Sequence, residues 1–171
     1  NTNSNDMVLN NMTTGRLDFS SDATESALIR SDKNGIKLDR DLTIGTAGTK
    51  NTLLQAGKQG TVRLGSGKTI TSTSSDEFYG MTAGNFAGAD GKKATAKNLG
   101  TLAIGGNKSL GMAIDVDDEG INKGTINFTG TNGAGVYNTG IFTAKSGSSI
   151  NVNSPGQNSI GAFNSGTLTI D

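Results

Sequence analysis

Residues 122–140 read NKGTINFTGTNGAGVYNTG, in which short apolar segments alternate with corners rich in glycine and asparagine. Ile126 and Phe128 flank the polar Asn127, and this period of two is typical of a strand with one buried face. Residues 130–133 supply the turn-forming side chains that a tight corner requires. A helix is disfavoured, because each interior glycine costs about 1 kcal/mol relative to alanine. We therefore expect short strands joined by tight corners.

The same pattern repeats along the chain. A Gly-Thr-apolar-x-apolar frame occurs at Gly60–Leu64, Gly100–Ile104, Gly124–Phe128 and Gly166–Ile170. A second frame, glycine followed by apolar or small residues, begins at Gly111, Gly135 and Gly161, with spacings of 24 and 26 residues. Short strands that recur at such a period predict a solenoid, in which each coil stacks on the next.

The fold class that we expect is all-β, a single-stranded right-handed parallel β-helix (β-solenoid), in one domain over residues 1–171. Residues 1–56 are predicted to form irregular N-terminal coils with a candidate cap, and residues 57–171 regular coils with an insertion at about 72–97. A solenoid suits a chain with only 32% hydrophobic residues, because inward side chains stack on the neighbouring coils. Disorder is opposed by the formal net charge of zero, since disordered chains usually combine low hydrophobicity with high net charge.

Asparagine recurs beside the corners. Asn98, Asn122 and Asn164 each precede the glycine of a Gly-Thr frame by two residues, and Asn138 stands in a related Asn-x-Gly site. We expect the first three at the same repeat position, with each amide bonded to its equivalent one coil away. The alternative is that these amides contact a ligand.

The chain contains no histidine and no cysteine. This composition excludes the usual zinc ligand set, a Ser-His-Asp triad, a cysteine nucleophile and disulfides. We therefore predict no catalytic residue, no metal site and no cofactor. The 15 basic residues balance 15 acidic ones, and no basic run exceeds Lys92-Lys93, so no nucleic-acid partner is expected. No stretch approaches the 18 or so apolar residues of a membrane-spanning helix, so the chain itself is not expected to cross a membrane.

The acidic run at residues 115–120 loosely matches the first half of a calcium-binding EF-hand loop. The twelfth position is Ile126 rather than the glutamate that closes such a loop, so we interpret the run as a solvated corner. A carbohydrate-active β-helix enzyme, a polysaccharide lyase or hydrolase, is the alternative function. It needs two carboxylates placed across a bound sugar, and one acidic corner is weak support for such a pair.

Residues 122–140 combine Asn-x-Gly-Thr-Ile-x-Phe with Thr-Asn-Gly-Ala-Gly-Val-Tyr-Asn-x-Gly. This combination resembles repeats in the β-helical passenger domains of Gram-negative type V autotransporter adhesins, and the similarity extends over residues 98–171. The resemblance implies export through an outer-membrane barrel, anchoring through a C-terminal barrel outside this chain, and display at the extracellular cell surface. It further implies attachment to host or other bacterial cells through a protein or glycan receptor. A structural spacer without a ligand is the other non-enzymatic interpretation.

The region from residue 72 to 97 departs from the repeat and is the predicted partner-binding loop. It combines aromatic and basic side chains, a composition typical of binding hot spots carried on scaffold loops. The candidate residues are Phe78, Tyr79, Phe86, Lys92, Lys93 and Lys97. The alternative is that Phe78 and Met81 belong to the core of a longer coil, with the lysines in a solvated turn.

Overall fold

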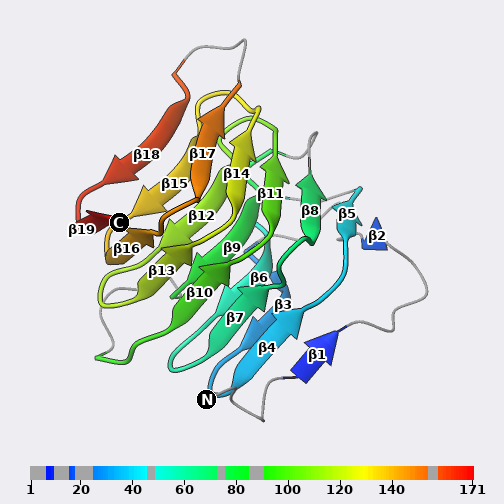
Figure 1. Cartoon of the computed structure of the whole chain (residues 1–171). Coiled ribbons are helices and arrows are strands. Elements are labelled where there is room, and N and C mark those ends of the chain that lie inside the picture. Colours follow the sequence, from blue (N-terminus) through cyan, green and yellow to red (C-terminus); the bar gives the residue numbers. More distant parts are fainter. Residues whose placement is uncertain are drawn as a thin grey trace.

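The computed structural model describes residues 7–9, 16–17, 25–45, 49–72, 76–84, 91–153 and 158–171. These residues form strands and contain no helix. The strands build three parallel sheets, of seven, six and six strands, which wrap around a common interior (Figure 1). We call them sheet 1, sheet 2 and sheet 3, in the order in which the chain visits them.

The strand bounds are as follows. Sheet 1 contains β1 (Met7–Leu9), β4 (Gly35–Leu38), β7 (Thr61–Leu64), β10 (Thr95–Asn98), β13 (Glu119–Asn122), β16 (Ile141–Ala144) and β19 (Thr167–Ile170). Sheet 2 contains β2 (Arg16–Leu17), β5 (Leu42–Ile44), β8 (Thr69–Ser72), β11 (Thr101–Ile104), β14 (Thr125–Phe128) and β17 (Ser149–Val152). Sheet 3 contains β3 (Ala27–Ser31), β6 (Thr52–Ala56), β9 (Tyr79–Ala83), β12 (Leu110–Ile114), β15 (Ala134–Asn138) and β18 (Ile160–Asn164).

The chain passes through the three sheets in turn and then returns to sheet 1 one coil further on. Each inner strand pairs in parallel with the preceding and the following coil, as β10 does with β7 and β13. The strands β3, β4 and β5, which precede residue 57, pair in the same way with β6, β7 and β8. The predicted parallel β-helix is therefore confirmed, and the same three sheets run through both parts of the chain.

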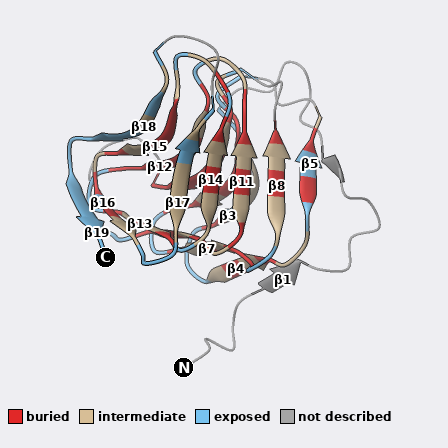
Figure 2. Cartoon of the chain, turned by 45° about the horizontal axis from the view of Figure 1, so that its top comes forward, coloured by how far each residue is buried: buried red, intermediate tan, exposed pale blue. Residues whose placement is uncertain are grey.

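Alternating side chains fill the interior. Ile126 and Phe128 are completely buried, whereas Asn127 between them lies half-buried on the outside. Leu102 lies opposite Ile126 on the neighbouring strand, so apolar side chains stack from coil to coil. Figure 2 shows this alternation of buried and half-buried residues along β8, β11 and β14. Stacking lets a few apolar residues per coil exclude water, because each is covered by its neighbours in the coils above and below.

Glycines in sheet 3 bring two sheets into close contact. Gly111 and Gly135 are second residues of their strands, and each faces an isoleucine of sheet 2. A Cβ atom on Gly111 would lie 2.7 Å from Cγ2 of Ile126 and 2.5 Å from the carbonyl oxygen of Gly135. A larger side chain at this position would therefore push the two sheets apart.

The Gly-Thr frames fall at two different places in the coil. Those at Gly100 and Gly124 lead into β11 and β14 of sheet 2, whereas those at Gly60 and Gly166 lead into β7 and β19 of sheet 1. The corner from sheet 1 to sheet 2 and the corner from sheet 3 to sheet 1 both need a short turn before a half-buried strand. The frame therefore marks a type of corner and not a fixed position in the repeat.

The asparagines are divided in the same way. Asn98 Nδ2 donates to Asn122 Oδ1 at 2.8 Å where sheet 1 turns toward sheet 2, and Asn138 Nδ2 donates to Asn164 Oδ1 at 2.5 Å where sheet 3 turns toward sheet 1. The predicted amide ladder is confirmed for these two pairs. The expectation that Asn164 shares a position with Asn98 and Asn122 is wrong, because both corners use the same Asn-x-Gly turn.

Candidate functional site

A groove of about 640 Å³ lies on the outer face of sheet 3. Its volume is within the range of about 300–1,000 Å³ that is usual for ligand pockets. It crosses several coils, since its walls come from β3, β6, β9, β12 and β15 and from the corners before β3 and β6. The lining residues are Glu25, Ser26, Arg30, Lys50, Thr52, Gln55, Tyr79, Leu110, Ala113 and Tyr137.

Two tyrosines stand over an apolar floor. Tyr79 lies on β9 and Tyr137 on β15, with β12 between the two strands. Leu110 of β12 is in register with Tyr79, whereas the buried Ala113 is in register with Tyr137. The two tyrosines are therefore two strand spacings, about 10 Å, apart across the strands and are also offset by three residues along them. They contribute two separate aromatic surfaces to the same groove.

The aromatic surface continues one coil further. The rings of Tyr137 and Phe163 are stacked, with centroids 4.9 Å apart and planes 9° from parallel. Phe163 is 41% exposed, which is high for a phenylalanine. The signal for this pair was present in the sequence, because Tyr137 and Phe163 occupy the same place in the second frame. A stacked, exposed aromatic pair is typical of a surface that contacts a partner.

The other end of the groove is polar. Arg30 Nη1 donates to Gln55 Oε1 at 3.2 Å, and Gln55 Nε2 donates to the carbonyl oxygen of Gly84 at 3.2 Å. Next to Gln55 in register is Thr82, which is 1% exposed and whose Oγ1 has no hydrogen-bond partner among the described residues. A buried hydroxyl without a partner costs free energy.

Tyr79 keeps its hydroxyl proton at neutral pH. Its burial, and after that the negative charges of Glu77 and Glu25, raise the pKa of Tyr79 above the ordinary value of 10.0. A neutral phenol both donates and accepts a hydrogen bond. Tyr79 therefore offers the groove an apolar ring and a polar end together.

A column of charged and amide side chains borders the groove at the corner before sheet 3. Each member stands two residues before its strand and has a positive φ, and we call this set the corner column: Glu25, Lys50, Glu77, Lys108, Asn132 and Asn158. Lys50 pairs with Glu25 at 3.6 Å and Lys108 with Glu77 at 3.5 Å. Asn158 Nδ2 donates to Asn132 Oδ1 at 3.2 Å. Along the column, side chains of neighbouring coils therefore pair with each other through ion pairs or a hydrogen bond.

The structure does not bring the six predicted loop residues together. Phe78 is fully buried, as is Met81, so the alternative that these two belong to the core is confirmed. Tyr79 lines the groove on sheet 3, whereas Lys97 is a half-buried residue of β10 in sheet 1. Burial removes Phe78 from any contact surface of the folded chain.

The remaining predicted residues lie after β9. Lys92 and Lys93 are exposed, and Lys93 Nζ lies 3.3 Å from Glu119 Oε2. Phe86 lies outside the described residues. Residues 84–94 connect β9 to β10, whereas residues 115–118 make the same connection one coil later. The additional residues in this part of the chain therefore fall in the connection between β9 and β10. The strands β9 and β10 themselves are regular.

The acidic corner has a structural role. Asp118 is buried, and its Oδ1 accepts a hydrogen bond of 2.6 Å from the backbone nitrogen of Ala94 in the preceding coil. Asp115 is buried beside it and accepts from the backbone nitrogen of Val116 at 2.8 Å. The expectation of a solvated corner is wrong for these two carboxylates, because they cap backbone groups. Within the described part of the chain, no cluster of three or more acidic side chains is placed to hold a metal ion.

Comparison with protein-family models, curated proteins and solved structures finds no match to this chain. Over the described residues there is no helix long and apolar enough to span a membrane. Sequence reasoning missed Arg30, Gln55 and Tyr137, which come from three coils and meet only on the folded surface.

Proposed function

We propose that this chain is a non-catalytic segment of a surface-displayed adhesin, a β-helical passenger fragment of an autotransporter that attaches to host or other bacterial cells. Receptor contact takes place in the groove of sheet 3. The observation that carries the proposal is the groove that Tyr79 and Tyr137 help to line on the outside of a regular solenoid. The parent protein is displayed at the outer membrane and reaches the extracellular space.

The scaffold supports this role because it holds the groove residues in fixed relative positions. Their strands are paired in register from β3 through β15, and the core under them is fully buried. A preorganised surface loses little conformational entropy when it binds. A solenoid also presents an extended face, which is suited to long receptors.

The receptor is a protein or a glycan. Aromatic rings supply apolar contact area, and the amide and guanidinium groups of Gln55 and Arg30 supply directed hydrogen bonds. An extended chain with alternating apolar and polar groups fits such a mixed surface, whether it is a peptide segment or an oligosaccharide.

Attachment of the purified, fluorescently labelled segment to host epithelial cells and to bacterial cells tests the proposed site. Tyr79→Ala and Arg30→Ala should each reduce attachment, because they remove an aromatic wall and a polar contact. Asn151→Ala is the matched control, since Asn151 is an exposed residue on the outer face of sheet 2. Circular dichroism of each variant establishes that it is folded. Attachment that is unchanged in both folded groove variants would exclude the groove as the receptor site.

Display at the surface is tested separately. Antibodies raised against the segment should label intact cells that produce the parent protein, and external protease should remove the signal. Labelling that requires permeabilised cells would contradict the proposed location.

A further inference from the structure

Three basic side chains stand directly opposite one another on the outer face of sheet 1. Lys37 on β4 lies in register with Arg63 on β7, and Arg63 lies in register with Lys97 on β10. Adjacent strands are about 4.8 Å apart, so the column places one positive charge on each coil at that spacing. Like charges directly opposite on neighbouring strands are destabilising.

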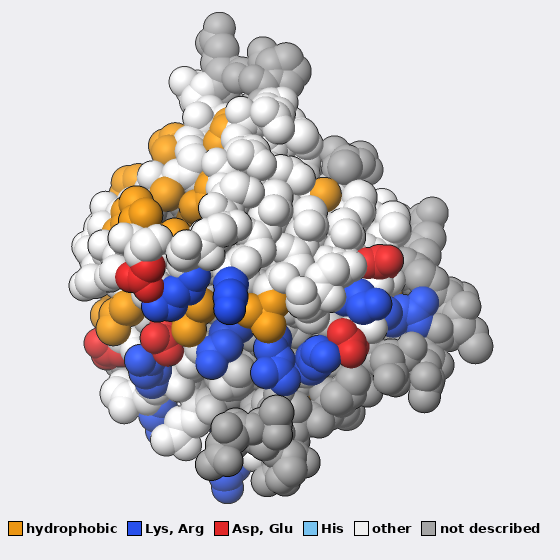
Figure 3. Space-filling view, in the orientation of Figure 1, with side chains coloured by type: hydrophobic (Ala, Val, Ile, Leu, Met, Phe, Trp, Pro, Cys, Tyr) orange, Lys and Arg blue, Asp and Glu red, His pale blue; other side chains and the backbone are white. Residues whose placement is uncertain are grey.

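The positive charge continues onto the next two coils. Lys123 and Lys145 follow β13 and β16, and their backbone nitrogens bond to the carbonyl oxygens of Asn98 and Asn122. Both side chains are exposed. We call this set of five residues the basic stripe: Lys37, Arg63, Lys97, Lys123 and Lys145. Figure 3 shows Lys and Arg side chains gathered in a band across this face, and four strand spacings give the stripe a length of about 19 Å.

Acidic partners are found at the two ends of the stripe. Lys37 Nζ lies 2.8 Å from Asp39 Oδ2, and Lys145 pairs with Asp171. Over the described residues, no ion pair holds Lys97 or Lys123. The hydrogen bond from Lys37 lowers the pKa of Asp39 below 3.8, and the charges of Lys37, Lys68 and Arg63 add to this effect. Lys97 and Lys123 therefore carry positive charge that no described acidic side chain pairs with.

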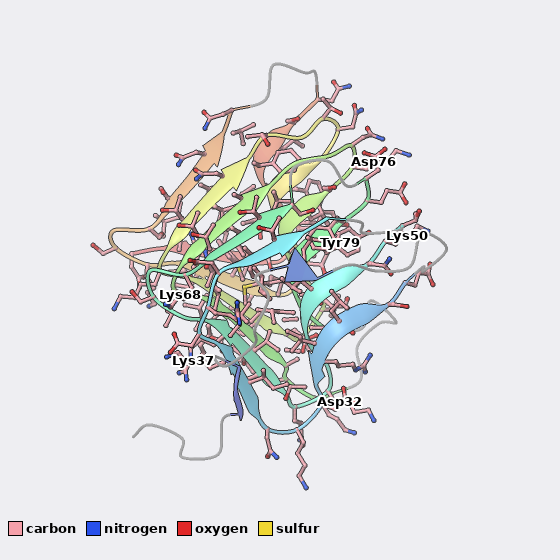
Figure 4. The ribbon with its side chains drawn as sticks, turned by 90° about the vertical axis from the view of Figure 1, so that its right-hand side faces the viewer. Asp32, Lys37, Lys50, Lys68, Asp76 and Tyr79 are labelled. Carbon is pink, nitrogen blue, oxygen red and sulfur yellow. The ribbon has the colours of Figure 1, made fainter. Side chains whose placement is uncertain are left out.

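The stripe and the groove belong to different faces. The stripe lies on sheet 1 and the groove on sheet 3, and in Figure 4 Lys37 and Lys68 lie on the opposite side of the view from Lys50 and Tyr79. The chain as a whole has zero formal net charge. The stripe is thus a local segregation of charge, which raises the concentration of anions at this face.

We propose that the basic stripe binds a linear acidic polysaccharide, one that carries carboxylate or sulfate groups, with its chain aligned along the solenoid axis across the strands of sheet 1. The ligand chemistry follows from cations placed one per coil: Lys37, Arg63 and Lys97 form a row on the outer face of sheet 1, and Lys123 and Lys145 continue it at the adjoining corner toward sheet 2. The in-register positions that continue the Lys37 column are Ile121, Thr143 and Thr169, so the row has no aromatic platform. A single-stranded nucleic acid needs such rings to stack its bases, which favours the polysaccharide.

Binding to immobilised heparin, a sulfated acidic polysaccharide, tests this site, with neutral dextran as the blank. We expect heparin affinity to fall as salt rises, because exposed charges are screened. The double variant Lys97→Gln/Lys123→Gln should lose about tenfold in affinity, because it removes two charges of the stripe. The matched control is Lys33→Gln/Lys108→Gln, which removes the same charge from two exposed positions outside the stripe and the groove and should bind within about twofold of the unmodified chain.

The outcomes separate this proposal from the function of the groove. Tyr79→Ala should keep full heparin binding, since it leaves the stripe intact. Unchanged affinity in the stripe variant, or an equal loss in the Lys33→Gln/Lys108→Gln control, would overturn the proposal. A polythymidine oligonucleotide that binds the unmodified chain more tightly than heparin would assign the stripe to a nucleic acid instead.

Discussion

Charged side chains stack from coil to coil in two regions of this solenoid, and the two regions arrange their signs differently. In the corner column, Glu25 meets Lys50 and Glu77 meets Lys108, so opposite charges alternate. In the basic stripe, Lys37, Arg63 and Lys97 follow one another with the same sign. The backbone places both sets at one residue per coil, so the difference is carried by side chains alone.

The two arrangements have opposite effects on the contact between neighbouring coils. Alternating signs neutralise one another, and the corner column becomes part of what holds neighbouring coils together. A run of equal signs weakens the contact between coils and leaves the charges available to an external partner. We therefore expect the basic stripe, rather than the corner column, to be the charged surface that contacts a partner.

Disrupting the apolar core on which both columns depend should reduce the stability most. Ile126→Asp buries an unpaired carboxylate in the core and should cost several kcal/mol of unfolding free energy, because a buried charge without a partner is severely penalised. Asn127→Asp on the outer face should change the stability little. Thermal melting of both variants measures the contrast. Equal losses would mean that the two residues do not face opposite sides.

Removing a buried amide should have the next largest effect. Asn122 accepts from Asn98 and donates to the carbonyl oxygen of Ser149, so Asn122→Ala leaves buried polar groups of two coils unpaired. We expect a loss of about 1–3 kcal/mol in urea unfolding. Asn151→Ala, which breaks only an exposed amide pair with Asn127, serves as the control. A loss as small as that of the control would show that the ladder does not stabilise the coils.

Reversing one charge should make the corner column resemble the stripe. Glu77→Lys replaces the partner of Lys108 and places three positive positions in succession with Lys50. These pairs are exposed, so the expected loss is only about 0.5–1 kcal/mol, reduced by added salt. A positive φ is no obstacle, because Lys50 and Lys108 already adopt it. Unfolding at low and high salt measures the effect, and a gain in stability at low salt would contradict the account.

The phenol of Tyr79 reports on the same acidic neighbours. In a Tyr137→Phe background Tyr79 is the remaining tyrosine, and its ultraviolet titration should show a pKa above 10.0. Glu77→Gln should lower that pKa toward the ordinary value, since it removes a nearby negative charge. Because the folded pKa is raised, this contribution to stability is complete below pH 10 and is lost as the pH rises through the folded pKa. An unshifted titration would show that Tyr79 is solvated.

The fold was predictable because period-two alternation and repeated corners are local signals. The assignment of each corner to a particular pair of sheets was not predictable. Asn122 and Asn164 precede the same Asn-x-Gly turn, but Asn122 lies between sheets 1 and 2 and Asn164 between sheets 3 and 1. The groove escaped prediction because Arg30, Gln55 and Tyr137 are brought together by coils of unequal length. Tyr137 was nevertheless marked by Phe163, which occupies the same place in the next coil. Phe78 could not be separated from surface aromatics, because its burial depends on the coils on either side.

The most direct test of the contrast between the two regions is a pair of identical substitutions. Lys97→Gln and Lys108→Gln each remove one positive charge, the first from the basic stripe and the second from the corner column. Urea unfolding at low salt should show that Lys97→Gln is neutral or stabilising, whereas Lys108→Gln lowers the unfolding free energy by about 0.2–1 kcal/mol. Both differences should shrink at high salt. A loss of stability in Lys97→Gln equal to that in Lys108→Gln, at both salt concentrations, would contradict the claim that the positive charges of the stripe repel one another and destabilise the folded chain.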